Sequence, residues 1–494
     1  MNRRSALVAA AVGYGLVALA ALLVAVVRGG VATTAAAILL CAAPLLLHLA
    51  VRVPALSAVA LGGVLGAAPF ATIPGTGTYA VLALAVWFAV TVLCLRPRSS
   101  RQNTAVLGML AAFLIVSAFS MVVTFDGIGA LLTYLRWALA AGITVLALVA
   151  DERMRRAVLR AFVAGAVLGA ATALVMVLLD PDGQLLNSLT VFGYGDTSAV
   201  GNLRTVSVDG ASLTRASGLY VDPNVAGLFF LFAFGIAGAQ LRGRRRLLVL
   251  ALLAVAIVGT FSRGAMGALV IGLAVTLVVS RSSAGARAAS AVAGILALGS
   301  LYWVPALRDR FVDSFDSRTA GVSDRVDALA NYPAQMAGHW WFGRGWDLRE
   351  FTDAAYGYSL NHVANTPLLI VWRAGILSGL LFVALLLVVL VVAIRRSRRG
   401  AASGRSGGGS ANLALAVYAG TILFAFQVDF PVVTMTPLTL AFGLLLAQLC
   451  SVDASPRGPA GSGVGERAAP AVADAPALAA SATPPSSPRQ ERQP

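Results

Sequence analysis

The sequence predicts an all-α, polytopic integral membrane protein. Of the 494 residues, 59% are hydrophobic and only 12% are charged, whereas a soluble globular protein carries about 25% charge. The mean hydropathy is +0.84, and the charged residues gather in short clusters between long apolar runs. These observations exclude a water-soluble enzyme.

Apolar runs long enough to cross a bilayer follow one another along most of the chain. A hydrocarbon core of ~30 Å needs ~20 apolar residues per helix, so we expect about 12–14 transmembrane helices. The runs lie near residues 5–27, 31–51, 54–73, 78–95, 104–124, 128–150, 157–179, 222–241, 247–261, 264–280, 288–305, 366–393, 411–428 and 432–450. The first run is longer than the ~7–15 apolar residues of a cleavable signal peptide, and we therefore expect it to be the first helix.

The arginines predict the orientation. All 37 basic residues are Arg, and with the N-terminus inside the cell, 25 lie on the cytoplasmic side, ten lie outside, and Arg136 and Arg373 lie within spans. This bias follows the positive-inside rule, and it places both termini in the cytoplasm. Topology thus accounts for the net charge of +16, and no nucleic-acid partner is expected.

Residues 1–450 form the predicted membrane domain, with two long external loops at 180–221 and 306–365. Loops longer than ~12–15 residues are uncommon unless they are functional or disordered. Both loops contain aromatic residues, so we expect them to be ordered, with short helices. By contrast, residues 451–494 lack aromatics and are rich in Pro, Ala and Ser. Such a segment cannot bury enough apolar surface to fold, which predicts a disordered cytoplasmic tail.

Few residues are suited to catalysis. The chain has no phosphate-binding loop, paired metal-binding His motif or Gly-X-Ser-X-Gly elbow, and its three cysteines lie in apolar runs that cannot form a metal cluster. We therefore expect no metal and no cofactor. Of the three histidines, His48 is expected to face another helix, whereas His339 and His362 fall in the second external loop.

Three arginines on the external side stand at the ends of predicted spans. Arg215 begins Arg-Ala-Ser-Gly-Leu-Tyr-Val-Asp-Pro-Asn, Arg263 ends Gly-Thr-Phe-Ser-Arg, and Arg325 lies in Ser-Asp-Arg-Val-Asp. The planar, permanently charged guanidinium suits phosphate and diphosphate oxygens. Each arginine alone would also be explained by a neighbouring Asp or a lipid headgroup.

The stretch 339–346, His-Trp-Trp-Phe-Gly-Arg-Gly-Trp, concentrates aromatic residues beside two glycines. Its tryptophans could stack on sugar faces or form an interfacial belt at the level of the lipid headgroups. Further along, residues 361–366 lead into a long helix that carries Arg373 about two turns down. Ionisable groups are costly in a membrane, so Arg373 and Arg136 are expected to face the protein interior or a wet cavity.

Several of these segments resemble the O-antigen ligase and polymerase superfamily. The stretch 215–227 resembles its Arg-x-x-Gly…Pro-Asn segment, Ser262-Arg-Gly-Ala265 resembles its Ser-Arg-Gly-Ala element, and Arg325 followed by Pro333 and Gly343-Arg-Gly345 resembles its large-loop pattern. Asn365 and Gly375 match the spacing of its His-Asn-x9-Gly signature. The family's His, directly before Asn, is Ala364 here, and the nearest histidine is His362.

The resemblance implies a metal-independent, inverting glycosyltransferase in a bacterial cell membrane, acting on its external face in cell-envelope or exopolysaccharide synthesis. Its donor would be an undecaprenyl-diphosphate-linked glycan and its acceptor a glycan or glycolipid, with the chain acting as ligase or polymerase. The catalytic residues would be His362, Arg263 and Arg325. The substrate-binding residues would be Arg215, Asn224, Trp340, Trp341, Arg344 and Asn365.

Two other functions stay open. A lipid-linked glycan flippase or exporter would need substrate groups near the membrane midplane, usually on paired broken helices, whereas the polar groups here gather at the outer rim. A degenerate, non-catalytic member of the family is the other alternative, because Ala364 replaces the family's His.

Overall fold

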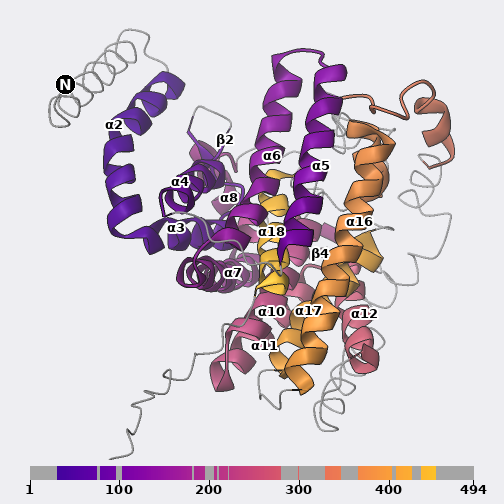
Figure 1. The fold of residues 1–494 in the computed structure, drawn as a ribbon. Coiled ribbons are helices and arrows are strands. Elements are labelled where there is room, and N and C mark those ends of the chain that lie inside the picture. The colour runs from indigo at the N-terminus through magenta and orange to yellow at the C-terminus, as the bar shows by residue number, and fades with distance from the viewer. Residues whose placement is uncertain are drawn as a thin grey trace, which may run out of the picture. The chain divides into compact units, whose positions relative to one another are not determined.

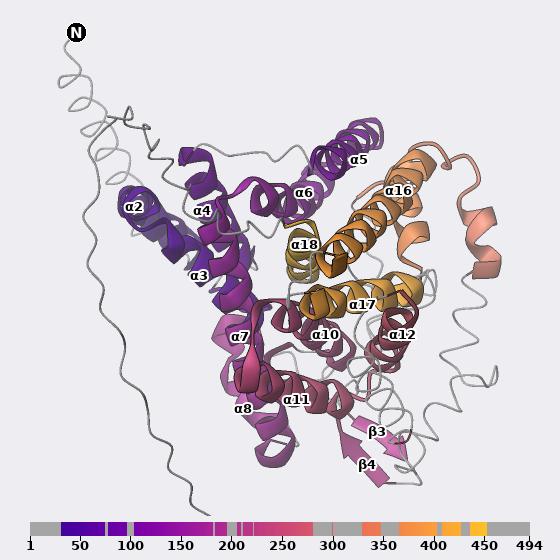
Figure 2. The ribbon, with the colours of Figure 1, turned by 60° about the horizontal axis from the view of Figure 1, so that its bottom comes forward.

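The computed structural model is mostly helical, as two views of its ribbon show (Figure 1, Figure 2). The chain divides into the units 1–451 and 452–494, and all described residues belong to the first. The structure describes residues 31–74, 78–95, 103–180, 183–194, 205–208, 211–220, 222–279, 299, 329–346, 365–402, 408–425 and 435–451. The proposed tail, 452–494, therefore lies outside them.

Besides the helical residues 329–335, thirteen α-helices are defined within these ranges. They are α2 (Val31–Arg52), α3 (Pro54–Ala67), α4 (Ala80–Cys94), α5 (Thr104–Val123), α6 (Ile128–Val149), α7 (Glu152–Leu179), α8 (Gln184–Ser188), α10 (Pro223–Gln240), α11 (Gly243–Gly259), α12 (Arg263–Val279), α16 (Thr366–Ala402), α17 (Gly408–Ala425) and α18 (Thr436–Cys450). Of the fourteen apolar runs, twelve overlap one of these helices. The runs 5–27 and 288–305, apart from residue 299, lie outside the described residues.

Within the part of the chain that the structure describes, five helices are long and apolar enough to cross a membrane: α5, α6, α7, α10 and residues Thr366–Arg398 of α16. A sixth span results if residues Cys41–Arg52 of α2 and the helix α3, which meet at an angle of 109°, are taken together. The chain is thus a multi-pass helical membrane protein. The expected total of about 12–14 spans stays a prediction.

The described part of the loop 180–221 contains the short helix α8, as expected. It also holds the 3-10 helices η2 (Thr190–Phe192) and η3 (Gly218–Tyr220). Strands β3 (Thr205–Val208) and β4 (Ala211–Thr214) pair antiparallel in this loop, and a second small hairpin joins β1 (Thr72–Ile73) to β2 (Thr78–Tyr79). The alternating Thr-Val-Ser-Val before Asp-Gly is a hairpin signal that the helical reading of the sequence overlooked.

Glycines bring α3 and α7 into backbone contact. A Cβ added at Gly62 or Gly66 of α3 would overlap the carbonyl oxygen of Val158 or Phe162 in α7, and one added at Gly165 would overlap the carbonyl oxygen of Gly63. Because lipid is as apolar as the side chains, helices in a membrane associate through close packing of small residues. The same packing joins α12 to α17, where Gly272 and Gly420 each meet the partner helix's backbone.

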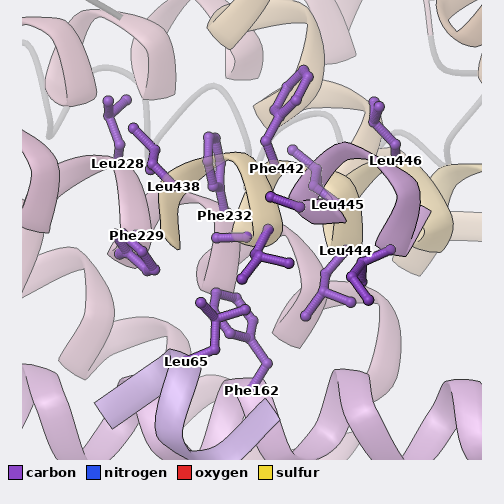
Figure 3. Packing of buried hydrophobic residues seen from close by; sticks show 14 of the residues in the cluster. Leu65, Phe162, Leu228, Phe229, Phe232, Leu438, Phe442, Leu444, Leu445 and Leu446 are labelled. Atoms are coloured by element: carbon purple, nitrogen blue, oxygen red, sulfur yellow. The ribbon is translucent and has the colours of Figure 1, made fainter. Parts of the chain in front are cut away.

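α10 lies at the centre of the largest hydrophobic cluster, and most of its residues are buried. Phe229 packs against Phe162 of α7, with ring centroids 6.4 Å apart, and Phe232 packs at 5.8 Å from Phe442 of α18. Figure 3 shows these rings converging with Leu65 of α3 and leucines of α18. α10 therefore fixes the positions of the helices around it.

Polar contacts identify one end of the helix bundle. Arg396, near the end of α16, donates to Asn103 just before α5 and to the carbonyl of Leu449 in α18, both at 3.0 Å. Gln240, the last residue of α10, bonds Gln448 of α18 at 2.6 Å. The starts of α10 and α16 and the end of α5 therefore lie at the opposite end, where the described segments around Arg215 and at 340–346 also pack.

The packing of α3 on α7 predicts opposite effects for two neighbouring glycines. Gly62→Ala should destabilise the protein by roughly 1–3 kcal/mol, because its methyl group would force two backbones apart. Gly63→Ala, whose Cβ would have no neighbour within 4 Å, should be neutral or stabilising by up to about 1 kcal/mol, since Ala favours the helix. Thermal unfolding in detergent measures both, and equal melting temperatures would contradict the close contact.

Candidate functional site

Arg215 links two of the segments singled out in the sequence. It is 5% exposed, its Nε donates to the carbonyl of Thr260 at 2.9 Å, and its Nη2 donates to Oδ1 of Asn224 at 2.9 Å. The next residue, Ala216, donates its backbone N–H to Gly259 at 2.8 Å. The chain between β4 and α10 is thereby held against the connection from α11 to α12.

The connection from α11 to α12 is a tight, strained turn. Phe261 has φ of 50° and is the only non-glycine residue with a positive φ in the described ranges, a conformation that costs of order 1–3 kcal/mol and is found at functional turns. Ser262 then caps α12 by accepting from the N–H of Ala265 at 3.4 Å. Arg263, which is half-buried, follows this turn directly and is the first residue of α12.

Gly227 allows the turn to approach α10. A Cβ at this position would lie 2.9 Å from the Cβ of Ala265 and 3.0 Å from that of Ser262, so a larger side chain would separate the two helix starts. At the start of α10, Oδ1 of Asp222 accepts from the N–H of Asn224 at 2.6 Å and that of Val225 at 3.4 Å. The N-termini of α10 and α12 thus lie beside the buried guanidinium of Arg215.

This arrangement concentrates positive charge. Helix N-termini carry a partial positive charge that attracts anions such as phosphate. Here two of them meet one buried and one half-buried arginine, Arg215 and Arg263, with Asp222 as a partial counter-charge. A diphosphate is a ligand whose charge and oxygens match this group.

Buried tyrosines hold the Arg215 segment on the membrane helices. The hydroxyl of Tyr220, in η3, donates to the carbonyl of Gly66 in α3, and Gly218 lies against the backbone of Ala173 in α7. Burial raises the pKa of Tyr220, with a smaller contribution from Tyr194. The phenol therefore stays protonated and remains a donor at physiological pH.

A second group of candidate residues surrounds a break in α16. Gly375 has non-helical torsions inside this helix, with φ of 83° and ψ of 170°. The segment 340–346 packs into the break: the N–H of Ile376 donates to Trp340 at 2.8 Å, and the N–H of Arg344 donates to Trp372 at 2.6 Å. Gly343 and Gly375 face each other's chains so closely that a Cβ on either would overlap backbone atoms.

Two arginine–tryptophan pairs join the segment 340–346 to α16, and each of the two segments contributes one arginine and one tryptophan. The guanidinium of Arg344 lies 5.0 Å from the ring of Trp372, and that of Arg373 lies 5.5 Å from the ring of Trp346. Each such pair contributes about 0.5–2 kcal/mol, more when it is desolvated. Sequence reasoning missed these pairs, although the arrangement of Arg-Gly-Trp in one segment and Trp-Arg in the other carries the signal.

The structure assigns different surroundings to the predicted substrate-binding residues. Asn224 bonds Arg215 and is otherwise exposed, whereas Asn365 caps α16 by accepting from the N–H of Leu368 at 3.1 Å. Trp340, Trp341 and Arg344 are exposed beside the break in α16. Arg325 and His362 lie outside the described residues, so their part in the site stays a prediction.

Three polar residues within predicted spans were expected to face the protein interior, and this expectation is confirmed for one of them and wrong for two. Arg373 is buried, as expected. Arg136 and His48 are exposed on the surface of the described helices rather than facing the interior.

The contact between Arg215 and Asn224 makes a prediction about stability. Arg215→Ala should destabilise the protein by roughly 1.5–3 kcal/mol, because it leaves the carbonyl of Thr260 without this charge-assisted donor. Asn224→Ala should cost less, and the two losses should not add: a coupling of roughly 0.5–3 kcal/mol is expected from residues in contact. Unfolding of both single variants and the double variant in detergent measures it; strictly additive losses would contradict the contact.

No protein-family model and no curated protein matches this chain.

Proposed function

We propose that this chain is a metal-independent, inverting membrane glycosyltransferase of the O-antigen ligase and polymerase type. On the external face of a bacterial membrane, it would transfer a glycan from an undecaprenyl-diphosphate carrier to a sugar or lipid acceptor. The observation that supports this most is the hydrogen bond from buried Arg215 to Thr260, which joins the turn before Arg263 to the start of α10. Two of the three arginine segments of the resemblance thus come together at two helix N-termini.

The arrangement suits the charge changes of the proposed reaction. The acceptor hydroxyl attacks the anomeric carbon of the donor, the bond from that carbon to the diphosphate oxygen breaks, and the electron pair leaves with undecaprenyl diphosphate. Positive groups aimed at the departing oxygens stabilise the developing charge. We assign this role to Arg215 and Arg263, with Arg325 as the third member, and assign the hydroxyl proton to His362 as base.

Two alternatives have distinct expectations. A flippase or exporter would keep its substrate groups near the midplane, whereas the group around Arg215 and Arg263 lies at one end of the described bundle. A non-catalytic member would bind the carrier without releasing undecaprenyl diphosphate.

In a deletion strain, accumulation of single carrier-linked repeats would indicate a polymerase, and accumulation of long carrier-linked chains would indicate a ligase.

The role assigned to Arg263 predicts a specific loss of activity. Arg263→Ala should lower the release of undecaprenyl diphosphate by about tenfold to a hundredfold, since a charge-assisted hydrogen bond contributes roughly 1.5–3 kcal/mol. Arg263→Lys should restore little, because an ammonium cannot bind two oxygens in one plane. Purified protein in proteoliposomes, supplied with a carrier-linked glycan and a sugar acceptor, provides the measurement.

Arg244→Ala is the matched control for this prediction. Arg244 is exposed in the first turn of α11, at the end of that helix opposite the turn, and its loss should leave the rate unchanged. Full activity of Arg263→Ala would remove that residue from the site. Activity that EDTA abolishes and Mg²⁺ restores would contradict neutralisation of the diphosphate by arginines alone.

The external location of the site is a further prediction. In a variant without native cysteines, Ala337→Cys should react with a membrane-impermeant maleimide on intact cells, because the positive-inside rule places this end of the bundle outside. Arg244→Cys should react only after the membrane is permeabilised. Both positions are exposed, so a difference in labelling reports only the side of the membrane on which each residue lies. Labelling of Arg244→Cys on intact cells, with Ala337→Cys labelled only after permeabilisation, would contradict a reaction on the external face.

A further inference from the structure

Three consecutive aromatic residues, Trp340–Phe342, form an exposed surface that we call the aromatic tip. Their exposed fractions are 37%, 74% and 40%. The tip continues the apolar surface at the end of α5: the rings of Phe342 and Phe119 lie 5.9 Å apart, and Phe119 and Val122 are themselves 59% and 69% exposed. Contiguous apolar surface of this kind marks a membrane or protein contact.

The backbone of the aromatic tip is attached to two membrane helices. Trp340 accepts from the N–H of Ile376, directly after the break in α16, at 2.8 Å. Phe342 accepts from the hydroxyl of Ser120, in the last turn of α5, at 2.5 Å. The level of the tip relative to a bilayer is therefore set by α5 and α16.

Two helix lengths, both counted from one shared level, give the level of the aromatic tip. Arg396 bonds Asn103 at 3.0 Å, so the end of α16 and the start of α5 lie at the same height. From there α5 runs 20 residues, Thr104–Val123, which is about 30 Å at 1.5 Å per residue. In α16, the stretch between the break and Arg396, residues 376–395, is also 20 residues and about 30 Å long at the same rise. Since a hydrocarbon core is ~30 Å thick, both counts place the tip at its boundary.

We propose that the aromatic tip inserts into the headgroup–acyl boundary of the bilayer, beside the end of α5, and so anchors the segment 329–346 to the lipid surface. Trp and Tyr favour this layer because their rings are apolar and their N–H or O–H groups reach water. Arg344, also exposed, stands two residues beyond the tip, where the lipid phosphates lie. The occupant of this surface is phospholipid rather than a sugar, and the inference is independent of the proposed reaction.

The same geometry changes the expected position of Arg373. If Gly375 marks the boundary, then the first nine residues of α16, 366–374, lie outside the hydrocarbon core. Arg373 is then buried by protein, against Trp346, at the level of the headgroups rather than two turns deep in the membrane. A buried cation is less costly there than in hydrocarbon.

Site-directed spin labelling in phosphatidylcholine–phosphatidylglycerol liposomes tests the anchor. In a variant without native cysteines, Trp341→Cys carries a nitroxide, and its relaxation by lipid-soluble O₂ is compared with that by a water-soluble nickel chelate. The label should behave like one at Val122→Cys, with O₂ several-fold more effective than at Ala337→Cys, an exposed position just before the tip. A label at 341 that responds to nickel as position 337 does would overturn the proposal.

A second measurement uses the native side chains. Phospholipids brominated near the headgroup should quench the tryptophan fluorescence of the wild-type protein, and Trp341→Phe should remove a measurable share of this quenching. Trp346→Phe, which replaces a ring that is 2% exposed, is the control and should leave the share unchanged. Equal quenching of wild type and Trp341→Phe would also overturn the proposal, and neither result depends on whether the protein transfers glycan.

Discussion

A chain that crosses a bilayer has no water in the hydrocarbon core to satisfy its backbone N–H and C=O groups, and the rest of this structure depends on meeting that constraint. The break at Gly375 would leave such groups exposed in α16. Instead, Ile376 and Trp372 find partners in Trp340 and Arg344 of another segment. The exact fit of the two chains requires glycine at 343 and at 375, because any Cβ there would overlap backbone.

Close backbone contact is also what holds the helices together. The carbonyls of Val158 and Phe162 meet Gly62 and Gly66 directly, and such contacts supply dispersion energy that lipid cannot match. Tyr220 adds a hydrogen bond to Gly66, so the packing of α3 on α7 also supports the segment that begins at Arg215. The packed helices α3 and α7 thereby hold the segment with Arg215 in place at one end of the bundle.

The charge of Arg215, at that end, is buried. Arg215 is 5% exposed, and the carbonyl of Thr260 and the amide oxygen of Asn224 are among its acceptors. Both of these acceptors are neutral, so they fix the position of the guanidinium without themselves cancelling its charge. This property connects the observed geometry with the proposed binding of a diphosphate.

The sequence by itself determined the helical membrane class and the places of most helices, because hydropathy over ~20 residues is a local property that lipid selects directly. It also singled out Arg215, Arg263 and the glycines at 343 and 375 as special. Only the tertiary structure decided which of them meet: the bond from Arg215 to Thr260, the reciprocal arginine–tryptophan pairs and the β3–β4 hairpin all depend on neighbours. The exposure of Arg136 and His48 was mispredicted for the same reason, since the direction a side chain faces depends on how helices distant in sequence pack around it.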